Sequence, residues 1–521
     1  MERRINYPVG IQTFPEIIRD KYLYVDKSAR IHQLVTSCKY VFLSRPRRFG
    51  KSLLTSTIES LFLGKRELFK DLAIDNMDFD WSRRAVFRLD LSGMNYTDKP
   101  EALYNRLNLY LSNWEKIYGA EEAEKELEDR LAGVITRARA KTGHRVVILI
   151  DEYDKPILDT AHVTENMEKC RNTLYGFYGA LKHCDENIRF ALITGVTKVA
   201  HVSIFSGLNN LEDISLLDEY SDICGISEAE FREYFSESVS QYATRRRTTE
   251  SAVWDLFKKE YDGYRFSTGG VPIYNPFSVI KAFKYGKIGH YWFKSGTPTF
   301  LARLMKEREF NLSTLDDVKA TESQLTDLPD LSSDIIPLLY QTGYLTIKRE
   351  DTDYGIITLG LPNEEVRDAF WEALFKSYVQ KDIPQGEIDM NTLRLSIQAG
   401  DVDGFMSQVQ TIFAKLPTDG NKNLERHFHN IMTVIFMMLG YAPGIKVVSV
   451  KGSSDMVVMT KDNVYIFEYK IDSSPEAALR QIEEKGYARP YTGGPRHVIL
   501  IGVNFDTADR SLASWKEKRY S

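Results

Sequence analysis

Cysteine is scarce in this 521-residue chain and shows no spacing typical of a metal site. The four cysteines stand at positions 38, 170, 184 and 224, and no two of them form a C-x-x-C pair. This spacing argues against structural zinc and favours reduced thiols in the core of a cytosolic protein.

Long apolar runs and a dominant charge are also lacking. The longest apolar stretch, IMTVIFMMLGYAPG, is shorter than the roughly 20 residues that span a bilayer, and no apolar segment follows the charged N-terminus. The formal net charge of −5 argues against a globally basic nucleic-acid binder, so such a surface must be a local patch. We expect a cytoplasmic protein with no membrane partner.

The length of the chain exceeds what one hydrophobic core supports, and no internal repeat is visible. Changes in pattern along the sequence divide it into four segments. We expect an α/β domain over 1–205, a mostly helical lid over 206–385, a helical linker over 386–417 and a small α/β domain over 418–521.

The first 200 residues alternate apolar strand-like runs with helical patterns, as a mainly parallel sheet does. Two surface helices are expected between the second and third strands. The expected strands cover 40–44, 85–93, 146–151 and 189–195.

Two later stretches have their own element orders. Residues 335–370 predict helix, hairpin and helix, an order that suits a winged-helix-like module with a charged turn between its strands. The last 100 residues predict an α-β-β-β-α-β order. The expected strands are 344–348 and 355–360 in the first stretch, and 445–450, 455–460, 464–470 and 497–505 in the second.

The segment FLSRPRRFGKSLL, residues 42–54, contains the tripeptide Gly50-Lys51-Ser52 between a predicted strand and a predicted helix. This is the context of a phosphate-binding loop, in which backbone N–H groups surround phosphates at a helix N-terminus. Lys51 would reach the β- and γ-phosphates of ATP, and the Ser52 hydroxyl would hold Mg²⁺.

The first half of this loop departs from the usual pattern, because Arg45 stands where a glycine is expected. Pro46 stiffens the loop, and the arginines at 45, 47 and 48 add charge that could neutralise phosphate, so we include Arg45 and Arg48 in the predicted site. The alternative is a basic surface turn before an ordinary helix.

A second motif favours the nucleotide site. The apolar strand VVILID ends in Asp151-Glu152, about 100 residues after the loop, and a buried parallel strand delivers its C-terminal residues to the crevice where nucleotides bind. Asp151 would hold Mg²⁺ through water, and Glu152 would act as general base on the attacking water. An acidic turn after a core strand is the alternative.

A third group of charged residues lies near the C-terminus. Glu468 and Lys470 are two apart on a predicted strand and so share a face. If Asp462-Asn463 forms a two-residue turn, residue 461 pairs with 464 and Asp455 lies directly opposite Lys470. Asp455, Glu468 and Lys470 then converge on one spot.

Two carboxylates on one face repel each other unless a cation lies between them, and Mg²⁺ takes oxygen ligands. Such a metal would polarise a phosphodiester, while Lys470 would orient or activate a water. A hairpin with ordinary surface charges is the alternative, although burying Glu468 and Lys470 without a task would be costly.

The sequence resembles the bacterial AAA-ATPase-like family that is usually fused to a C-terminal PD-(D/E)xK nuclease-like domain. The resemblance covers nearly the whole chain and is carried by YVDKS, FLSRPRRFGKSLL, ILIDEYDKP, LITGVTKVAHVSIFSGLNNLEDISL and YDGYRF. It implies an α/β multidomain fold: a P-loop NTPase parallel sheet, a helical and winged-helix-like lid, and a small restriction-endonuclease-like domain.

The same resemblance adds four site residues. It implies that Thr194 senses the γ-phosphate, although from the residues alone Thr194 is equally a strand-end residue. It implies that Glu425 is the first acidic residue of the nuclease core, although an exposed structural glutamate is a close alternative. It places Gln481 and Tyr487 on the trailing helix of that core.

Together these patterns predict an ATPase coupled to an Mg²⁺-dependent nuclease, with ATP and Mg²⁺ as cofactors. Nucleic acid is the expected partner, DNA being favoured over RNA, and the sequence allows a homo-oligomer without specifying one. The alternative is a nucleotide-dependent signalling or scaffold switch whose C-terminal domain binds nucleic acid without cutting it. A nucleotidyl or phosphoryl transferase has no further motif in its favour.

Overall fold

The computed structural model groups the chain into two compact units, Met1–Gly296 with Asp317–Val366, and Thr297–Asp316 with Arg367–Ser521. The four segments predicted from the sequence are a finer division and stay predictions. The structure describes residues 5–97, 99–161, 163–199, 204–205, 208, 210–293, 298–326, 328, 334–379, 388–416, 424–441, 443–449, 452–508 and 511–520.

The first unit contains a five-stranded parallel sheet in the order β2-β3-β4-β1-β5, which confirms the predicted mainly parallel sheet. The four predicted strands are present, and the short edge strand β5 was not predicted. The strands are β1 (Tyr40–Ser44), β2 (Val86–Asp90), β3 (Val146–Asp151), β4 (Ile188–Gly195) and β5 (Leu211–Asp213).

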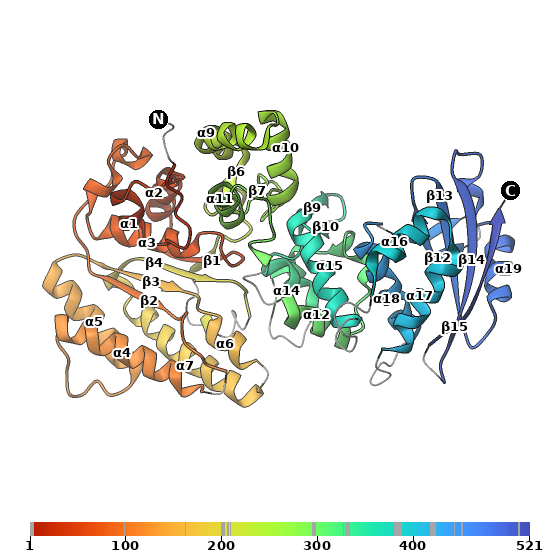
Figure 1. Cartoon of the computed structure of the whole chain (residues 1–521). Coiled ribbons are helices and arrows are strands. Elements are labelled where there is room, and N and C mark those ends of the chain that lie inside the picture. Colours follow the sequence, from red (N-terminus) through yellow and green to blue (C-terminus); the bar gives the residue numbers. More distant parts are fainter. Residues whose placement is uncertain are drawn as a thin grey trace. The chain divides into compact units, whose positions relative to one another are not determined.

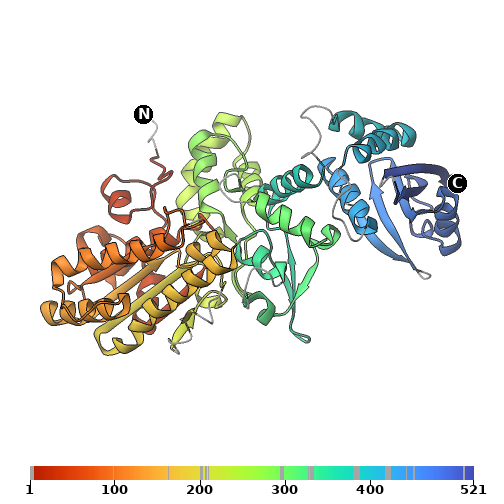
Figure 2. The ribbon, with the colours of Figure 1, turned by 90° about the horizontal axis from the view of Figure 1, so that it is seen from below.

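Helices cover both faces of this sheet, since β1, β3 and β4 are almost wholly buried. The first three helices lie on one side, and the helices drawn in orange and yellow lie on the other (Figures 1 and 2). These helices are α1 (Phe14–Arg19), α2 (Ser28–Ser37) and α3 (Lys51–Phe62), then α4 (Glu101–Tyr118), α5 (Leu127–Thr142), α6 (Lys155–Thr160) and α7 (Thr164–His183).

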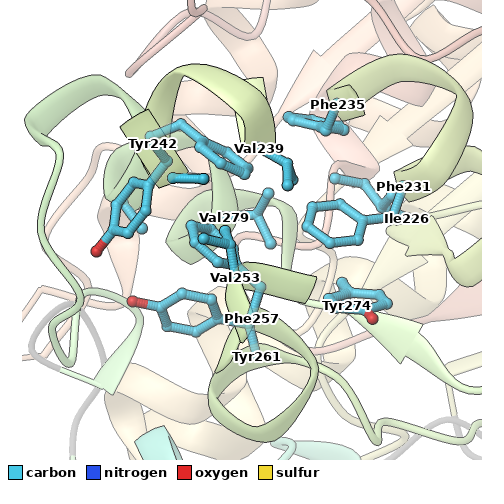
Figure 3. Packing of buried hydrophobic residues seen from close by; sticks show 13 residues of the cluster. Ile226, Phe231, Phe235, Val239, Tyr242, Val253, Phe257, Tyr261, Tyr274 and Val279 are labelled. Atoms are coloured by element: carbon cyan, nitrogen blue, oxygen red, sulfur yellow. The ribbon is translucent and has the colours of Figure 1, made fainter. Parts of the chain in front are cut away.

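The lid begins with three helices around an aromatic core (Figure 3). Ser227 and Glu230 form a capping box at the start of α9, which satisfies its first N–H groups. Phe257 and Phe283 stack at 4.2 Å between their ring centroids in this core. The elements are β6 (Ile226–Ser227), α9 (Glu228–Arg246), α10 (Glu250–Tyr261), β7 (Ile273–Tyr274) and α11 (Pro276–Tyr285).

The rest of the first unit has the predicted helix, hairpin and helix order, with an additional strand β8 that pairs with β10. Helix α15 gives its first three residues to this unit and the remainder to the second. The elements are β8 (Val318–Ala320), α13 (Glu322–Thr326), α14 (Ile335–Gln341), β9 (Thr346–Asp351), β10 (Ile356–Gly360) and α15 (Glu364–Tyr378).

The second unit is built on a mixed five-stranded sheet, β11-β12-β13-β14-β15, in which only β13 and β14 are parallel. Helix α19 packs so closely on β14 that a Cβ on Gly502 would lie 2.2 Å from the Pro475 carbonyl oxygen. The predicted α-β-β-β-α-β order is confirmed, and β15 follows it. The strands are β11 (Gly444–Ser449), β12 (Gly452–Met459), β13 (Asn463–Ile471), β14 (His497–Asp506) and β15 (Ser511–Tyr520).

The helices of the second unit include those of the segment predicted as a linker, 386–417. In α17, apolar residues at helical spacing face inward, which is typical of a packed amphipathic helix. The helices are α12 (Pro298–Glu307), α16 (Met390–Ala399), α17 (Val402–Ala414), α18 (Leu424–Met438) and α19 (Pro475–Lys485).

The buried carboxyl group of Glu365, in the first turn of α15, allows a test of the lid. Its Oε1 accepts hydrogen bonds from Ser278 Oγ (2.9 Å) and Trp292 N (2.7 Å), and its Oε2 has no partner among the described residues. Burial raises the pKa of Glu365 from 4.5 to about 7. Between these values the unfolded chain has lost a proton that the folded chain keeps.

We therefore expect the free energy of unfolding to fall as the pH rises from about 4.5 to 7, by roughly 3 kcal/mol in total. Glu365→Gln, which stays neutral, should remove this part of the pH dependence. Urea unfolding between pH 5 and 8 measures it, with Glu364→Gln as the matched control. Equal slopes for Glu365→Gln and the unchanged protein would contradict the expectation.

Candidate functional site

The phosphate-binding loop joins β1 to α3, as the sequence predicts. Gly50 precedes the helix with φ +102°, a conformation that a glycine adopts without strain. Arg48 is also left-handed, with φ +67°, and its guanidinium lies over the Phe277 ring. The loop therefore turns sharply twice before the first N–H groups of α3.

Lys51, the first residue of α3, has a buried ammonium group. Its Nζ donates to the carbonyl oxygens of Arg45 (2.8 Å) and Pro46 (3.1 Å). Burial lowers the pKa of Lys51, and the nearby carboxylates of Glu152 and Asp151 oppose that shift. The loop thus holds the cation beside the acidic end of β3.

The structure does not place Arg45 with the other predicted phosphate ligands. Its side chain is 1% exposed, and its guanidinium donates to the carbonyl oxygens of Ser44, Ser215 and Tyr220 at 2.8 to 3.1 Å. It also lies over the Phe266 ring. These contacts do not support a role in phosphate binding; Arg45 instead fixes the start of the loop.

Asp151 and Thr194 meet at the ends of neighbouring strands, β3 and β4. Both are buried, and Thr194 Oγ1 donates to Asp151 Oδ1 at 2.6 Å. Ser52 lies at the cavity beside Lys51. A hydroxyl and a carboxylate are oxygen donors of the kind that Mg²⁺ prefers, so Ser52 and Asp151 fit a magnesium ion that phosphates and waters complete.

Glu152 follows directly in the left-handed region, with φ +56°, and lines the same cavity. Burial raises the pKa of Glu152, Lys51 opposes the shift, and Asp151 and Asp154 add to it. A carboxylate with a raised pKa is a better proton acceptor, which suits a general base. The backbone at Glu152 is strained, and such strain clusters at functional sites.

Sequence reasoning missed Asp154, although it lies within the quoted motif ILIDEYDKP. Its carboxylate is buried and accepts from the Val196 amide and from the amide and hydroxyl of Thr197, at 2.7 to 3.2 Å. Asp154 therefore ties the turn after β3 to the turn after Thr194. Asp154 is the third acidic residue of the motif, and only its burial could have indicated this role.

Lys51, Ser52 and Glu152 line a cavity of about 500 Å³, a volume in the range of small-ligand sites. Other lining residues are apolar and come from the N-terminal segment, α2 and the lid helix α11. A flat base would suit these apolar side chains, and phosphates would suit the charged ones. The apolar lining residues include Ile11, Leu23, Val25, Ile31, Phe277 and Ile280.

The hairpin of the second unit corrects the predicted register. Met456 pairs with Phe467 and Met459 with Val464, so the continued ladder places Asp455 opposite Glu468 rather than Lys470. The turn consists of Lys461-Asp462, because the Thr460 hydroxyl and backbone bind the backbone of Asn463. The predicted turn at Asp462-Asn463 was therefore wrong by one residue.

Glu468, Lys470 and Gln481 nevertheless form one hydrogen-bonded group. Lys470 Nζ donates to Glu468 Oε1 (3.3 Å) and to Gln481 Oε1 (2.6 Å), and the Gln481 amide donates to Glu468 Oε1. Tyr487 is buried, and its side chain interacts with Gln481. The structure thus brings the two helix residues, Gln481 and Tyr487, to the strand residues.

Asp455 lies close to this group. Its Oδ2 accepts a hydrogen bond from the Tyr469 amide at 2.8 Å, which lowers the pKa of Asp455. Burial has the larger effect and raises that pKa. The pKa of Glu468 is raised to about 7, first by burial and then by the charge of Asp455. The charge of Asp455 therefore disfavours ionisation of Glu468, as expected of two acids that could share a cation.

Glu425 does not join this group as a ligand. It is exposed in the first turn of α18, and its charge raises the pKa of Asp455 less than burial does. One turn later on α18, the Nε2 of His429 lies 3.1 Å from the Asp455 carbonyl oxygen. His429 was not among the predicted site residues, and its spacing of four from Glu425 was the available signal.

The acidic pair fits a divalent cation. Glu468 is 2% exposed, and its Oε2 has no hydrogen-bond partner among the described residues. Within the described part of the chain, no three His, Cys, Asp or Glu side chains form a group able to hold a metal ion. Mg²⁺ commonly takes one or two carboxylates and keeps waters, so Asp455 and Glu468 are sufficient protein ligands.

Comparisons with known proteins agree with the two kinds of domain. A family model described as "Predicted AAA-ATPase" matches residues 8–205, and a model of the PD-(D/E)XK nuclease superfamily matches residues 423–515. An Azotobacter chroococcum mcd 1 protein titled "Uncharacterized protein in vnfD 5'region" is 34% identical over 527 residues, which cover 98% of each chain. The chain belongs to the AAA-ATPase-like family with a C-terminal PD-(D/E)XK nuclease-like domain.

The resemblance expected from the sequence is thereby confirmed for this AAA-ATPase-like protein. Among solved structures, the ORC2 protein of Aeropyrum pernix, in ADPNP–ADP complexes, covers 67% of this chain and 91% of its own. The identity is 12% and the TM-score 0.27, too low to bear on the site. None of the helices in the described ranges is long and apolar enough to cross a membrane.

Proposed function

We propose that this protein hydrolyses ATP and, coupled to that, cuts nucleic-acid phosphodiesters in a metal-dependent reaction. The observation that carries the proposal is the group formed by the buried Glu468 with the partly buried Lys470 and Gln481, beside Asp455. A domain that only grips nucleic acid has no need to bury a carboxylate next to a second carboxylate and a lysine. DNA is the substrate we favour over RNA.

In the first site, the Lys51 ammonium would leave the carbonyl oxygens of the loop and bind the β- and γ-phosphates. Asp151, held by Thr194, would orient the waters around the magnesium ion, which when bound neutralises charge on the phosphates. Glu152 would accept the proton of the attacking water. Its raised pKa supports that role, because the proton transfer is then more favourable.

In the second site, Asp455 and Glu468 would hold the metal, which when bound polarises the phosphodiester and acidifies a water. Lys470 would orient that water, and Gln481 would fix the positions of the Lys470 and Glu468 side chains through its hydrogen bonds to both. Tyr487 would support Gln481, and His429 would support the backbone of Asp455.

The lid contacts the phosphate-binding loop and so supports coupling. The indole Nε1 of Trp292 donates to the Arg47 carbonyl oxygen at 2.7 Å. A Cβ on Gly343 would lie 2.8 Å from the Pro46 ring, so the segment between α14 and β9 packs directly on the loop. A change in the loop on nucleotide binding would therefore move the lid.

Substitutions in the loop and after β3 test the ATPase. We expect Lys51→Ala to weaken binding of Mg-ATP by about 10- to 100-fold, because a charged hydrogen bond to phosphate is lost. Glu152→Gln should keep binding and lose hydrolysis by at least about 100-fold. Calorimetry and a phosphate-release assay measure both, and unchanged affinity in Lys51→Ala would defeat the assignment of the loop.

Substitutions in the hairpin test the nuclease, with DNA and RNA supplied in parallel. Asp455→Ala and Glu468→Ala should weaken divalent-metal binding and abolish cleavage. Lys470→Ala should abolish cleavage yet leave metal binding intact or tighter, because a neighbouring positive charge is removed. Asp462→Ala, in the exposed turn, is the matched control, and ATP hydrolysis should persist in all four variants.

If Lys470→Ala lost metal binding together with cleavage, the assigned roles of the three residues would be wrong. Specific nucleic-acid binding by the unchanged protein, without cleavage at any divalent-metal concentration, would favour the switch without nuclease activity.

Coupling predicts that the cleavage rate differs between ATP and a non-hydrolysable analogue. Trp292→Phe removes the hydrogen bond to Arg47 and should reduce that difference while ATP hydrolysis persists. Trp371→Phe is a matched control, since its indole nitrogen has no hydrogen-bond partner among the described residues. Identical rates with ATP, analogue and no nucleotide would show that the two activities merely share a chain.

A further inference from the structure

Lys155 is a cation of the nucleotide cavity to which no role has yet been given. It lines the cavity together with Lys51, Ser52 and Glu152. It begins α6, four residues after Asp151, and its ammonium pairs with the carboxylate of Asp159 one turn later. We propose that Lys155 binds the γ-phosphate of ATP and stabilises the charge on it during hydrolysis, an inference that rests on the proposed ATPase function.

The strand order places Lys155 at the terminal-phosphate end of the cavity. Lys155 follows β3 and Ser92 follows β2, and both residues line the cavity. In the sheet order β2-β3-β4-β1-β5, these strands lie on the side of β1 away from β5. The Lys155 amide donates to the carbonyl oxygen of Glu152 at 3.2 Å, and Glu152 is the proposed base for the water that attacks the γ-phosphate, so a triphosphate that passes Lys51 and meets that water ends beside Lys155.

The present partner of Lys155 can be exchanged for phosphate. The side chains of Lys155 and Asp159 are 25% and 18% exposed, and they form an i,i+4 pair within one helix. Such pairs contribute little to stability, and lysine is a mobile point charge. A γ-phosphate carries more charge than one carboxylate, whereas ADP leaves Lys155 with Asp159.

The hydrolysis step leaves Lys155 chemically unchanged. The water oxygen bonds to the γ-phosphorus as the bond from that phosphorus to the β–γ bridging oxygen breaks. Glu152 accepts the water proton, and ADP and inorganic phosphate are the products. Lys155 hydrogen-bonds to a γ-phosphate oxygen and offsets the negative charge there, an interaction that charged donors provide most strongly in water-excluded sites.

The test compares two nucleotides on the full-length protein. Calorimetry with ADP and with a non-hydrolysable ATP analogue is carried out on Lys155→Ala, Lys155→Arg and Asp159→Asn. Lys155→Ala should bind ADP within about twofold of the unchanged protein and lose affinity for the analogue by roughly 10- to 100-fold. Hydrolysis at saturating ATP should also fall by at least about tenfold.

The two other variants distinguish a direct contact between Lys155 and phosphate from an effect of the substitution on the protein's structure. Lys155→Arg, which keeps the charge, should retain most of the affinity for the analogue, and Asp159→Asn should bind it as well as or better than the unchanged protein. Equal losses for ADP and the analogue in Lys155→Ala, or no loss for either, would overturn the proposal. If the unchanged protein bound neither nucleotide, the proposed ATPase itself would fail, which is a different result.

Discussion

The burial of Arg45 is the constraint on which the nucleotide site depends. An arginine without access to water must find acceptors for its donors, and the carbonyl oxygens of Ser44, Ser215 and Tyr220 provide them for its two terminal nitrogens. These bonds fix the first residue of the loop, whose own carbonyl then accepts from Lys51. Where other phosphate-binding loops use a flexible glycine, this chain uses a guanidinium to hold the same turn.

A fixed loop allows several charges to be buried together at the end of β3. Lys51 would be costly to bury alone, and so would Asp151, Glu152 or Asp154, but each lies within the field of the others. The same balance recurs in the second unit, where Lys470 lies beside Glu468, whose pKa is raised to about 7. In both sites burial keeps the charges strongly interacting, which a solvated surface would not do.

Local pattern was sufficient for the strands of both sheets that are buried, because apolar runs report burial directly. It missed β5, which has only three residues, and β15, whose exposed charged residues are typical of an edge strand. Lys51, Asp151 and Glu152 could be predicted as site residues because each belongs to a short sequence motif that is typical of nucleotide-binding sites. Asp154 was missed and Arg45 was assigned to the wrong contacts, since what they do depends on donors and acceptors far away in the sequence.

In the hairpin, Asp455, Glu468 and Lys470 share a face as predicted, although the predicted register was wrong. Moving a two-residue turn by one position shifts the pairing by two residues, and side chains alternate with a period of two. Asp455 therefore changes its partner from Lys470 to Glu468 but stays on their face. The correction strengthens the physical case, because two carboxylates directly opposite each other repel, and the nearby ammonium group of Lys470, or a bound cation, would stabilise the pair.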